Sequence, residues 1–263
     1  MNLLLALLLA ALAAVPAAAH KAHGPEDLAG VGLDDSTGQK LPLDAQFTDE
    51  NGVKRPLSAW VDRPALLLPV YYACREHCAL MQENLALAMN QLALKPGRDF
   101  RAISLGFDPH EGPAAALSAK KTYLKLLKEE SPPDSWKFLT GDRKDIKRVT
   151  DALGYRYKFT GDDFAHPDVL AVLARDGKII RYIYGPEFLP FDTGMALTEA
   201  ARGTPAVSIR KLVSYCFTYD PGRKTYTFQA ARVLTAAVFL LTIAGMLLLL
   251  REKGPPQGRG GRA

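Results

Sequence analysis

Two cysteine residues, Cys74 and Cys78, are the residues of this chain best suited to chemistry. They follow the apolar run 66–70, where a β-strand would be expected to lead into an α-helix. If the helix begins near Cys74, a spacing of four places both sulfur atoms on one helical face, close enough to bind one metal ion or form a disulfide. A thiol at a helix N-terminus, with Arg75 beside it, forms the thiolate more readily than a free cysteine. We therefore expect Cys74 to be the more reactive thiol.

A soft metal ion bound by two thiolates needs at least one further ligand. Structural zinc would require a second cysteine pair, and the remaining cysteine, Cys216, is far away in the sequence. Thiolate and imidazole ligands together select Cu(I). We predict His166 as the third ligand, because it lies in a loop before a predicted hairpin and loops at one edge of an α/β sheet converge. His77 ranks below it because it points away from both sulfur atoms on a regular helix, and His110 follows a different strand.

The elements that would position these residues alternate between strands and helices. Apolar runs predict strands over residues 65–72 and 100–107. Two later segments, 169–174 and 179–184, flank an Asp-Gly turn, which is typical of a β-hairpin. This order predicts an α/β fold with a mixed sheet flanked by helices. Helices are predicted from Cys78 onward, where apolar residues recur at spacings of three and four, and over residues 112–130, 142–153 and 192–202.

Two apolar segments near the ends of the chain predict export and anchoring in a membrane. Residues 1–19 are almost wholly apolar and end in three alanines, which is typical of a signal peptide, although the segment holds no Lys or Arg. A retained signal anchor and a misplaced start codon are the alternatives. Residues 229–250 are long enough to cross a bilayer core of about 30 Å as a single transmembrane helix. Basic residues after this helix predict a cytoplasmic C-terminus and a main domain on the outer, periplasmic or extracytoplasmic, face of the cytoplasmic membrane.

The formal net charge of +5 gives no reason to expect a nucleic-acid partner. The tail, residues 251–263, holds four basic residues and one acidic residue, which is +3 of that total. The rest of the chain is therefore close to neutral. The predicted order along the chain is a signal peptide (1–19), a flexible leader (20–44), the α/β domain (45–202), a juxtamembrane segment (203–228), a transmembrane helix (229–250) and a basic cytoplasmic tail (251–263).

Together these residues resemble the Sco/SenC family of thioredoxin-fold, membrane-tethered copper chaperones. The resemblance covers roughly residues 47–184. It rests on the Cys-x-x-x-Cys spacing, on Asp108 and Pro109 after the second strand, on the Phe-Leu-Thr-Gly block at 138–141, and on His166 ahead of an Asp-Gly pair. A Cys-aromatic-x-Tyr-Asp-Pro segment that begins at Cys216 resembles the C-terminally anchored members.

The resemblance implies that Cys74, Cys78 and His166 hold copper, as Cu(I) or Cu(II), and that Asp108 is an acid close behind these ligands. It implies a function in assembly of the CuA centre of cytochrome c oxidase. The partner would be the CuA-bearing subunit or another copper chaperone. This chain departs from the family where prolines usually stand in and after the cysteine motif, since it carries Arg75 and Ala79 there, and it has a proline directly after the histidine.

Several alternatives remain open at this point. Handing over copper by ligand exchange requires no catalysis, so the resemblance does not imply an enzyme. A thiol-disulfide reductase would keep the acceptor's cysteines reduced, with Cys74 attacking and Cys78 resolving. A peroxidase would need one activated cysteine with an arginine poised against it, and an anchored domain without an active site is the remaining possibility. Cys216 would be a buried inert thiol, a haem- or metal-proximal residue, or a resolving cysteine.

Overall fold

The computed structural model describes residues 29–74, 77–128, 131–161 and 163–204, and the backbone of residues 217–220 and 225–228. They belong to two compact units, Met1–Pro205 and Ala206–Ala263. The predicted signal peptide, the predicted transmembrane helix (229–250), Cys216 and the basic tail lie outside the described residues. Within the described ranges, no helix is both long and apolar enough to cross a membrane.

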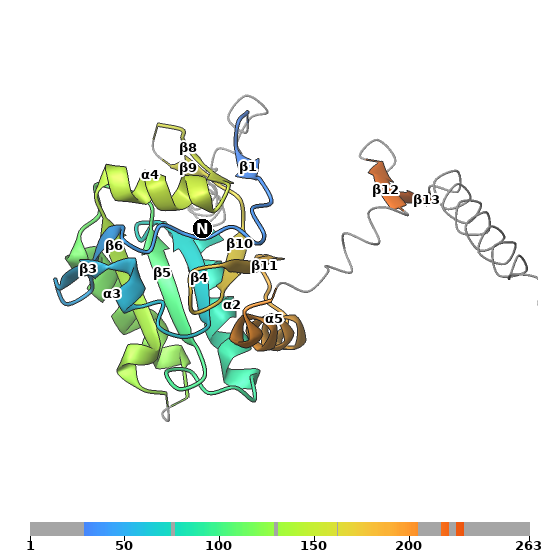
Figure 1. Ribbon diagram of the computed structural model, residues 1–263. Helices are drawn as coiled ribbons and strands as arrows, with labels where there is room; N and C mark the ends of the chain where they lie inside the picture. Colours follow the sequence, from blue (N-terminus) through green and yellow to red (C-terminus); the bar gives the residue numbers. More distant parts are fainter. Residues whose placement is uncertain are drawn as a thin grey trace, which may run out of the picture. The chain divides into compact units, whose positions relative to one another are not determined.

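A seven-stranded mixed sheet forms the centre of the first unit (Figure 1). Its strand order is β11-β10-β4-β5-β6-β2-β3. The three strands β4, β5 and β6 run parallel, and every other pairing in the sheet is antiparallel. The strands are β2 (Gln46–Asp49), β3 (Lys54–Pro56), β4 (Ala65–Val70), β5 (Arg101–Gly106), β6 (Trp136–Gly141), β10 (Val169–Leu173) and β11 (Ile179–Tyr184).

The order of these strands brings three loops to one edge of the sheet. Because β4 and β5 are parallel, the loops that follow them leave at the same edge. Because β10 is antiparallel to β4, the loop that precedes β10 also lies at that edge. All six residues of β4 are buried, as expected for a central strand with both faces covered.

In the described part of the chain, four α-helices flank the sheet, as the sequence predicted. They are α2 (His77–Gln91), α3 (Pro113–Tyr123), α4 (Arg143–Ala152) and α5 (Pro190–Arg202). Helix α2 contacts both α3 and α5, whereas α4 lies apart from them and packs beside β7 (Tyr155–Arg156) (Figure 1). The side chain of Asp142 caps α4 by accepting a hydrogen bond from the Asp145 N–H at 2.9 Å.

The predicted helix after the first strand is confirmed. Its described part begins at His77, and residues 75 and 76 lie outside the described residues. Cys74 lies in a turn after β4, in which its N–H donates to the Tyr71 carbonyl at 3.3 Å. That both sulfur atoms lie on one helical face stays a prediction.

The domain also begins earlier in the chain than the predicted boundary at residue 45. Strand β1 (Gly32–Leu33) pairs with β7, and the Ile179 N–H donates to the Gln39 carbonyl at 2.8 Å. Leu41 is 4% exposed and belongs to the core. Residues 29–44 are thus part of the folded unit, because their apolar side chains and backbone groups find partners that the sequence does not display locally.

The hairpin prediction is confirmed, since β10 and β11 pair as antiparallel neighbours across the Asp-Gly turn. Strand β6 was not predicted. In the second unit, β12 (Phe217–Asp220) and β13 (Thr225–Phe228) form an antiparallel pair within the segment expected to lie beside the membrane. That pairing was also not predicted.

Tyr123 of α3 is buried against the sheet, and its ionisation should lower the free energy of unfolding at alkaline pH. The ring stacks on Phe138, with centroids 6.4 Å apart, and burial raises the pKa of Tyr123 to about 12. An unfolded tyrosine ionises at about 10, so between these values only the unfolded state loses its proton. The free energy of unfolding should fall as pH rises through this window. Urea unfolding at stepwise pH should show a steeper fall for the wild type than for Tyr123→Phe, and equal slopes would contradict the assignment.

Candidate metal centre

The loops at the carboxyl edge of β4 bring a cysteine and a histidine into contact. Cys78 lies in the first turn of α2, and His166 follows the short strand β9 (Phe164–Ala165). The Sγ atom of Cys78 is 3.3 Å from Nε2 of His166, although 88 positions separate the two residues. Cys78 is fully buried and the His166 side chain is only 4% exposed. The histidine singled out from the sequence is therefore beside the cysteine motif.

Cys74 joins this group through the backbone of Cys78. Its Sγ accepts a hydrogen bond from the Cys78 N–H at 3.3 Å, and the two thiols are not joined by a disulfide. In contrast to Cys78, Cys74 is partly exposed. Among the described residues, no set of three or more His, Cys, Asp or Glu side chains already surrounds a common metal position. The three donors are neighbours, because Cys78 contacts both His166 and Cys74.

Burial controls the protonation of the inner thiol. The pKa of Cys78 is raised well above its usual value, mainly by burial and then by its hydrogen bond with Cys74. The negative groups of Asp168 and Glu111 act in the same direction. Cys78 is thus held as a neutral thiol until a cation or an oxidant arrives. Cys74 lies at the N-terminal end of α2 and accepts the Cys78 N–H, and its greater reactivity stays a prediction.

The surroundings of His166 orient its ring. Phe107 and Tyr71 pack edge-on against it, with centroids at 5.6 Å and 6.1 Å. On the side away from the sulfur, Nδ1 lies 3.4 Å from the Pro167 carbonyl oxygen and 3.8 Å from Oδ1 of Asp168. These acceptors favour the tautomer with the proton on Nδ1, which leaves the lone pair of Nε2 directed at Cys78.

The other residues named from the sequence lie in different positions. His77 is exposed, and its Nδ1 is 3.7 Å from Oδ2 of Asp168. His110 is exposed on the loop after β5. The Oδ1 atom of Asp108 accepts the His110 N–H at 2.9 Å, and Asp108 lines a cavity of about 320 Å³ together with Arg143. The role of Asp108 behind the metal ligands stays a prediction.

Glu111 contacts the cysteine loop and was missed in the sequence. Its two carboxylate oxygens accept the N–H of Tyr72 at 2.7 Å and the N–H of Ala73 at 2.6 Å. Burial raises the pKa of Glu111, while these two hydrogen bonds act against the rise. The rule that selected His166, convergence of loops at one sheet edge, could have found it, since Glu111 lies in the loop after β5.

A chain of buried hydrogen bonds holds the first turn of α2 against the sheet. The indole N–H of Trp136 donates to Ser104 at 3.0 Å, and the Ser104 hydroxyl donates to the side-chain oxygen of Gln82 at 3.1 Å. The side-chain amide of Gln82 in turn donates to the Cys78 carbonyl at 3.3 Å. Two strands and a helix therefore fix the position of Cys78 from behind.

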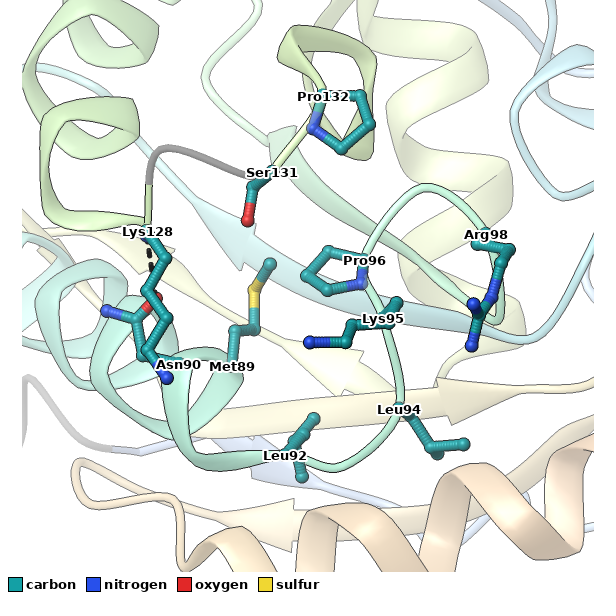
Figure 2. A pocket seen from close by; sticks show the side chains of 10 residues that line it. All are labelled: Met89, Asn90, Leu92, Leu94, Lys95, Pro96, Arg98, Lys128, Ser131 and Pro132. Carbon is teal, nitrogen blue, oxygen red and sulfur yellow. Dashed lines mark hydrogen bonds between the residues drawn. The ribbon is translucent and has the colours of Figure 1, made fainter.

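A second cavity, of about 190 Å³, lies at the other end of α2, near Met89 (Figure 2). This residue is about 16 Å from Cys78 along the helix axis. Figure 2 shows Asn90 bridging to Lys128, whose N–H it accepts at 3.0 Å. None of the described residues that line this cavity is Cys, His, Asp or Glu. It offers no donor set comparable to the Cys-His group.

The family of the chain follows from a comparison with family models. The SCO1/SenC model matches residues 35–190, which is more than half of the 263 residues. The chain therefore belongs to the SCO1/SenC family, as the sequence motifs implied. Its mixed sheet with flanking helices is the thioredoxin-like fold of that family. No curated protein matches the chain.

Solved structures share the fold of this chain. A candidate electron transfer protein from Aquifex aeolicus VF5 is 30% identical, with 64% of this chain and 95% of that chain covered and a TM-score of 0.58. Arabidopsis thaliana ScoI with copper bound is 17% identical, covers 63% and 98% of the two chains and has a TM-score of 0.51. BsSco, solved in a study of a disulfide switch, is 20% identical, covers 65% and 98%, and has a TM-score of 0.51. At these last two identities the likeness supports the fold alone.

The difference in burial predicts that the two thiols react at different rates. Iodoacetamide should modify Cys74 at least about tenfold faster than Cys78, because only thiolate reacts and Cys78 is both buried and raised in pKa. Cleavage after Arg75 separates the two cysteines into different peptides, so mass spectrometry can follow each rate. In urea the two rates should become similar. Equal rates in the folded protein would contradict the described environment.

Proposed function

We propose that this protein is a membrane-tethered copper chaperone that assembles the CuA centre of cytochrome c oxidase and binds copper through Cys74, Cys78 and His166. The observation that carries the proposal is the 3.3 Å approach of the His166 imidazole to the Cys78 sulfur, with Cys74 in the preceding turn. Distant parts of the sequence supply these donors. Burying a thiol and an imidazole side by side is more readily explained by metal binding than by packing of the core.

The donor set suits copper as cargo. Two thiolates and an imidazole are soft or borderline ligands of the kind that select Cu(I), and the same set can hold Cu(II). Cys78 and His166 are buried, whereas Cys74 is partly exposed. An acceptor can therefore approach copper from the Cys74 side and replace the ligands one at a time.

The relatives support this assignment of cargo and pathway. ScoI of Arabidopsis thaliana is a structure with copper bound, and BsSco is described as a member of the Sco family of cytochrome c oxidase assembly proteins. Membership of the SCO1/SenC family makes the same cargo our choice for this chain. The acceptor would be the CuA-bearing subunit, or another copper chaperone that passes the ion onward.

We place the domain on the outer face of the cytoplasmic membrane, anchored by residues 229–250 with the basic tail inside. The support is the composition of the apolar segments at both ends of the chain. Tethering donor and acceptor to one membrane raises their effective concentration, to about millimolar for a short flexible linker. Transfer between two sites of similar affinity then proceeds without a high affinity between the proteins.

A thiol-disulfide reductase is the second candidate, favoured by the hydrogen bond between the Cys78 N–H and the Cys74 sulfur. An N–H donor stabilises a thiolate, which is the form that attacks a disulfide. In this function Cys74 would attack a disulfide of the acceptor and Cys78 would resolve the mixed disulfide. The two functions differ in their need for His166.

Replacing His166 tests the proposal. His166→Ala should lower the affinity for Cu(I) at least about 100-fold, because losing a ligand costs no less than losing a residue that orients one. Competition with a chromophoric Cu(I) chelator measures the affinity, and thiol-disulfide exchange with a peptide disulfide is followed in parallel. Retained exchange with lost copper binding is the expected result.

His110→Ala is the matched control, because His110 is exposed on a neighbouring loop at the same edge of the sheet. This variant should bind copper like the wild type. Unchanged copper affinity in His166→Ala would remove the imidazole from the metal centre and leave the reductase as the better assignment.

A further inference from the structure

We propose that Glu111 is a positioning residue of this centre, which acts through the backbone of Tyr72 and Ala73 to hold Cys74 opposite Cys78 and His166. The part of this inference that concerns copper affinity rests on the proposed function. Glu111 itself lies outside the predicted set of ligands. Glu111 lies on the loop after β5, and the cysteines lie on the loop after β4. The carboxylate is thus a link between two neighbouring loops.

The Glu111 carboxylate accepts two hydrogen bonds from the backbone of the cysteine loop. Each carboxylate oxygen accepts one of two successive N–H groups, at 2.7 Å from Tyr72 and 2.6 Å from Ala73. Hydrogen bonds from N–H groups to a carboxylate are shorter and stronger than those between neutral groups. Two bonds to one planar carboxylate also fix the direction of the peptide, and the next residue in the chain is Cys74. Small changes at Glu111 therefore move the outer thiol.

The side chain of Tyr72 is anchored to the sheet, so the position of the backbone between Tyr72 and Cys74 depends on Glu111. The hydroxyl of Tyr72 donates to the carbonyls of Ser104 and Leu139, at 3.0 Å and 2.9 Å. The Tyr72 side chain is thus attached to the sheet, while the backbone toward Cys74 is attached by Glu111. Cys74 also accepts the Cys78 N–H from the first described turn of α2, so this bond and the paired contact at Tyr72 and Ala73 together position its sulfur.

Glu111 also adds a negative charge beside the thiols. A carboxylate beside the cysteine loop favours a bound cation, so loss of its charge and loss of its positioning contacts both lower the affinity for copper. Disulfide formation depends on positioning alone, because without the paired contact the backbone that leads into Cys74 is held less firmly.

The first test is copper affinity. Glu111→Gln keeps the shape but replaces one acceptor oxygen by an N–H₂ group and removes the charge, so the affinity for Cu(I) should fall about 10- to 100-fold. The Cu(II) complex should show a shifted thiolate charge-transfer band and broadened EPR hyperfine lines, because Cys74 is no longer held in one position. Glu111→Asp, which keeps the charge but shortens the side chain, should lie between the wild type and Glu111→Gln.

The second test needs no copper. The dithiol of Cys74 and Cys78 transfers two electrons and two protons to oxidised glutathione, which gives the protein disulfide and two molecules of reduced glutathione. In Glu111→Gln the equilibrium constant for this reaction should fall about tenfold, equivalent to one hydrogen bond to a charged group. Mass spectrometry after acid quenching measures the oxidised fraction, with disulfides involving Cys216 excluded by peptide mapping.

Asp49→Asn is the matched control for a merely structural role. Its Oδ1 accepts two backbone N–H groups, from Asn51 at 3.0 Å and from Val53 at 2.9 Å, in a turn after β2. This variant should lower the melting temperature without changing copper affinity, spectra or the glutathione equilibrium. If Glu111→Gln does not fold, Glu111→Asp decides by the same two measurements.

The outcomes separate the two proposals. If the wild type fails to bind copper but the glutathione equilibrium shifts in Glu111→Gln, the chaperone function fails and the positioning role stands. If copper affinity, spectra and the glutathione equilibrium are all unchanged in folded Glu111 variants, the positioning role is overturned whether or not the wild type binds copper.

Discussion

The antiparallel pairing of β10 with β4 is the constraint on which the rest of this centre depends. Strand β4 ends at the cysteine loop, and β10 begins three residues after His166. Only the opposite direction of these neighbours places the end of one strand beside the start of the other. The approach of the His166 ring to the Cys78 sulfur is a consequence of that pairing, as is its burial under Phe107 and Tyr71.

The two cysteines beside this contact differ in how they are held and in how far they are exposed. Cys78 is held from behind by the buried hydrogen bonds that run through Gln82 and Ser104 to Trp136, whereas Cys74 lies in a turn and is partly exposed. A buried inner pair of donors and a partly exposed outer donor suit a protein that must both take up and release an ion. A site with three rigid, buried ligands would bind more tightly but would pass its cargo on slowly.

The elements themselves were largely predictable, and the failures have local causes. Apolar runs and spacings of three and four identified β4, β5 and most of the helices, because those residues face the core with a regular period. Strand β6 was missed, because the family block at 138–141 drew attention to its motif and not to its place between β5 and β2. The boundary at residue 45 was wrong, because β1 is defined by its pairing with β7 and not by its own sequence. Asp108 attracted attention through a motif, yet the carboxylate that contacts the cysteine loop is that of Glu111.

By itself, the sequence determined the family, the kind of donor atoms, the candidate histidine and the edge of the sheet at which chemistry would occur, since residue types, spacing and strand order are all written along the chain. Only the tertiary structure decided which sulfur atom His166 contacts, which thiol is buried and which carboxylate holds the loop. Those relations depend on contacts between residues separated by about forty to ninety positions, such as Glu111 with Tyr72 and His166 with Cys78. Periodicity and propensity report only neighbours in the chain, so they carry no information on such contacts.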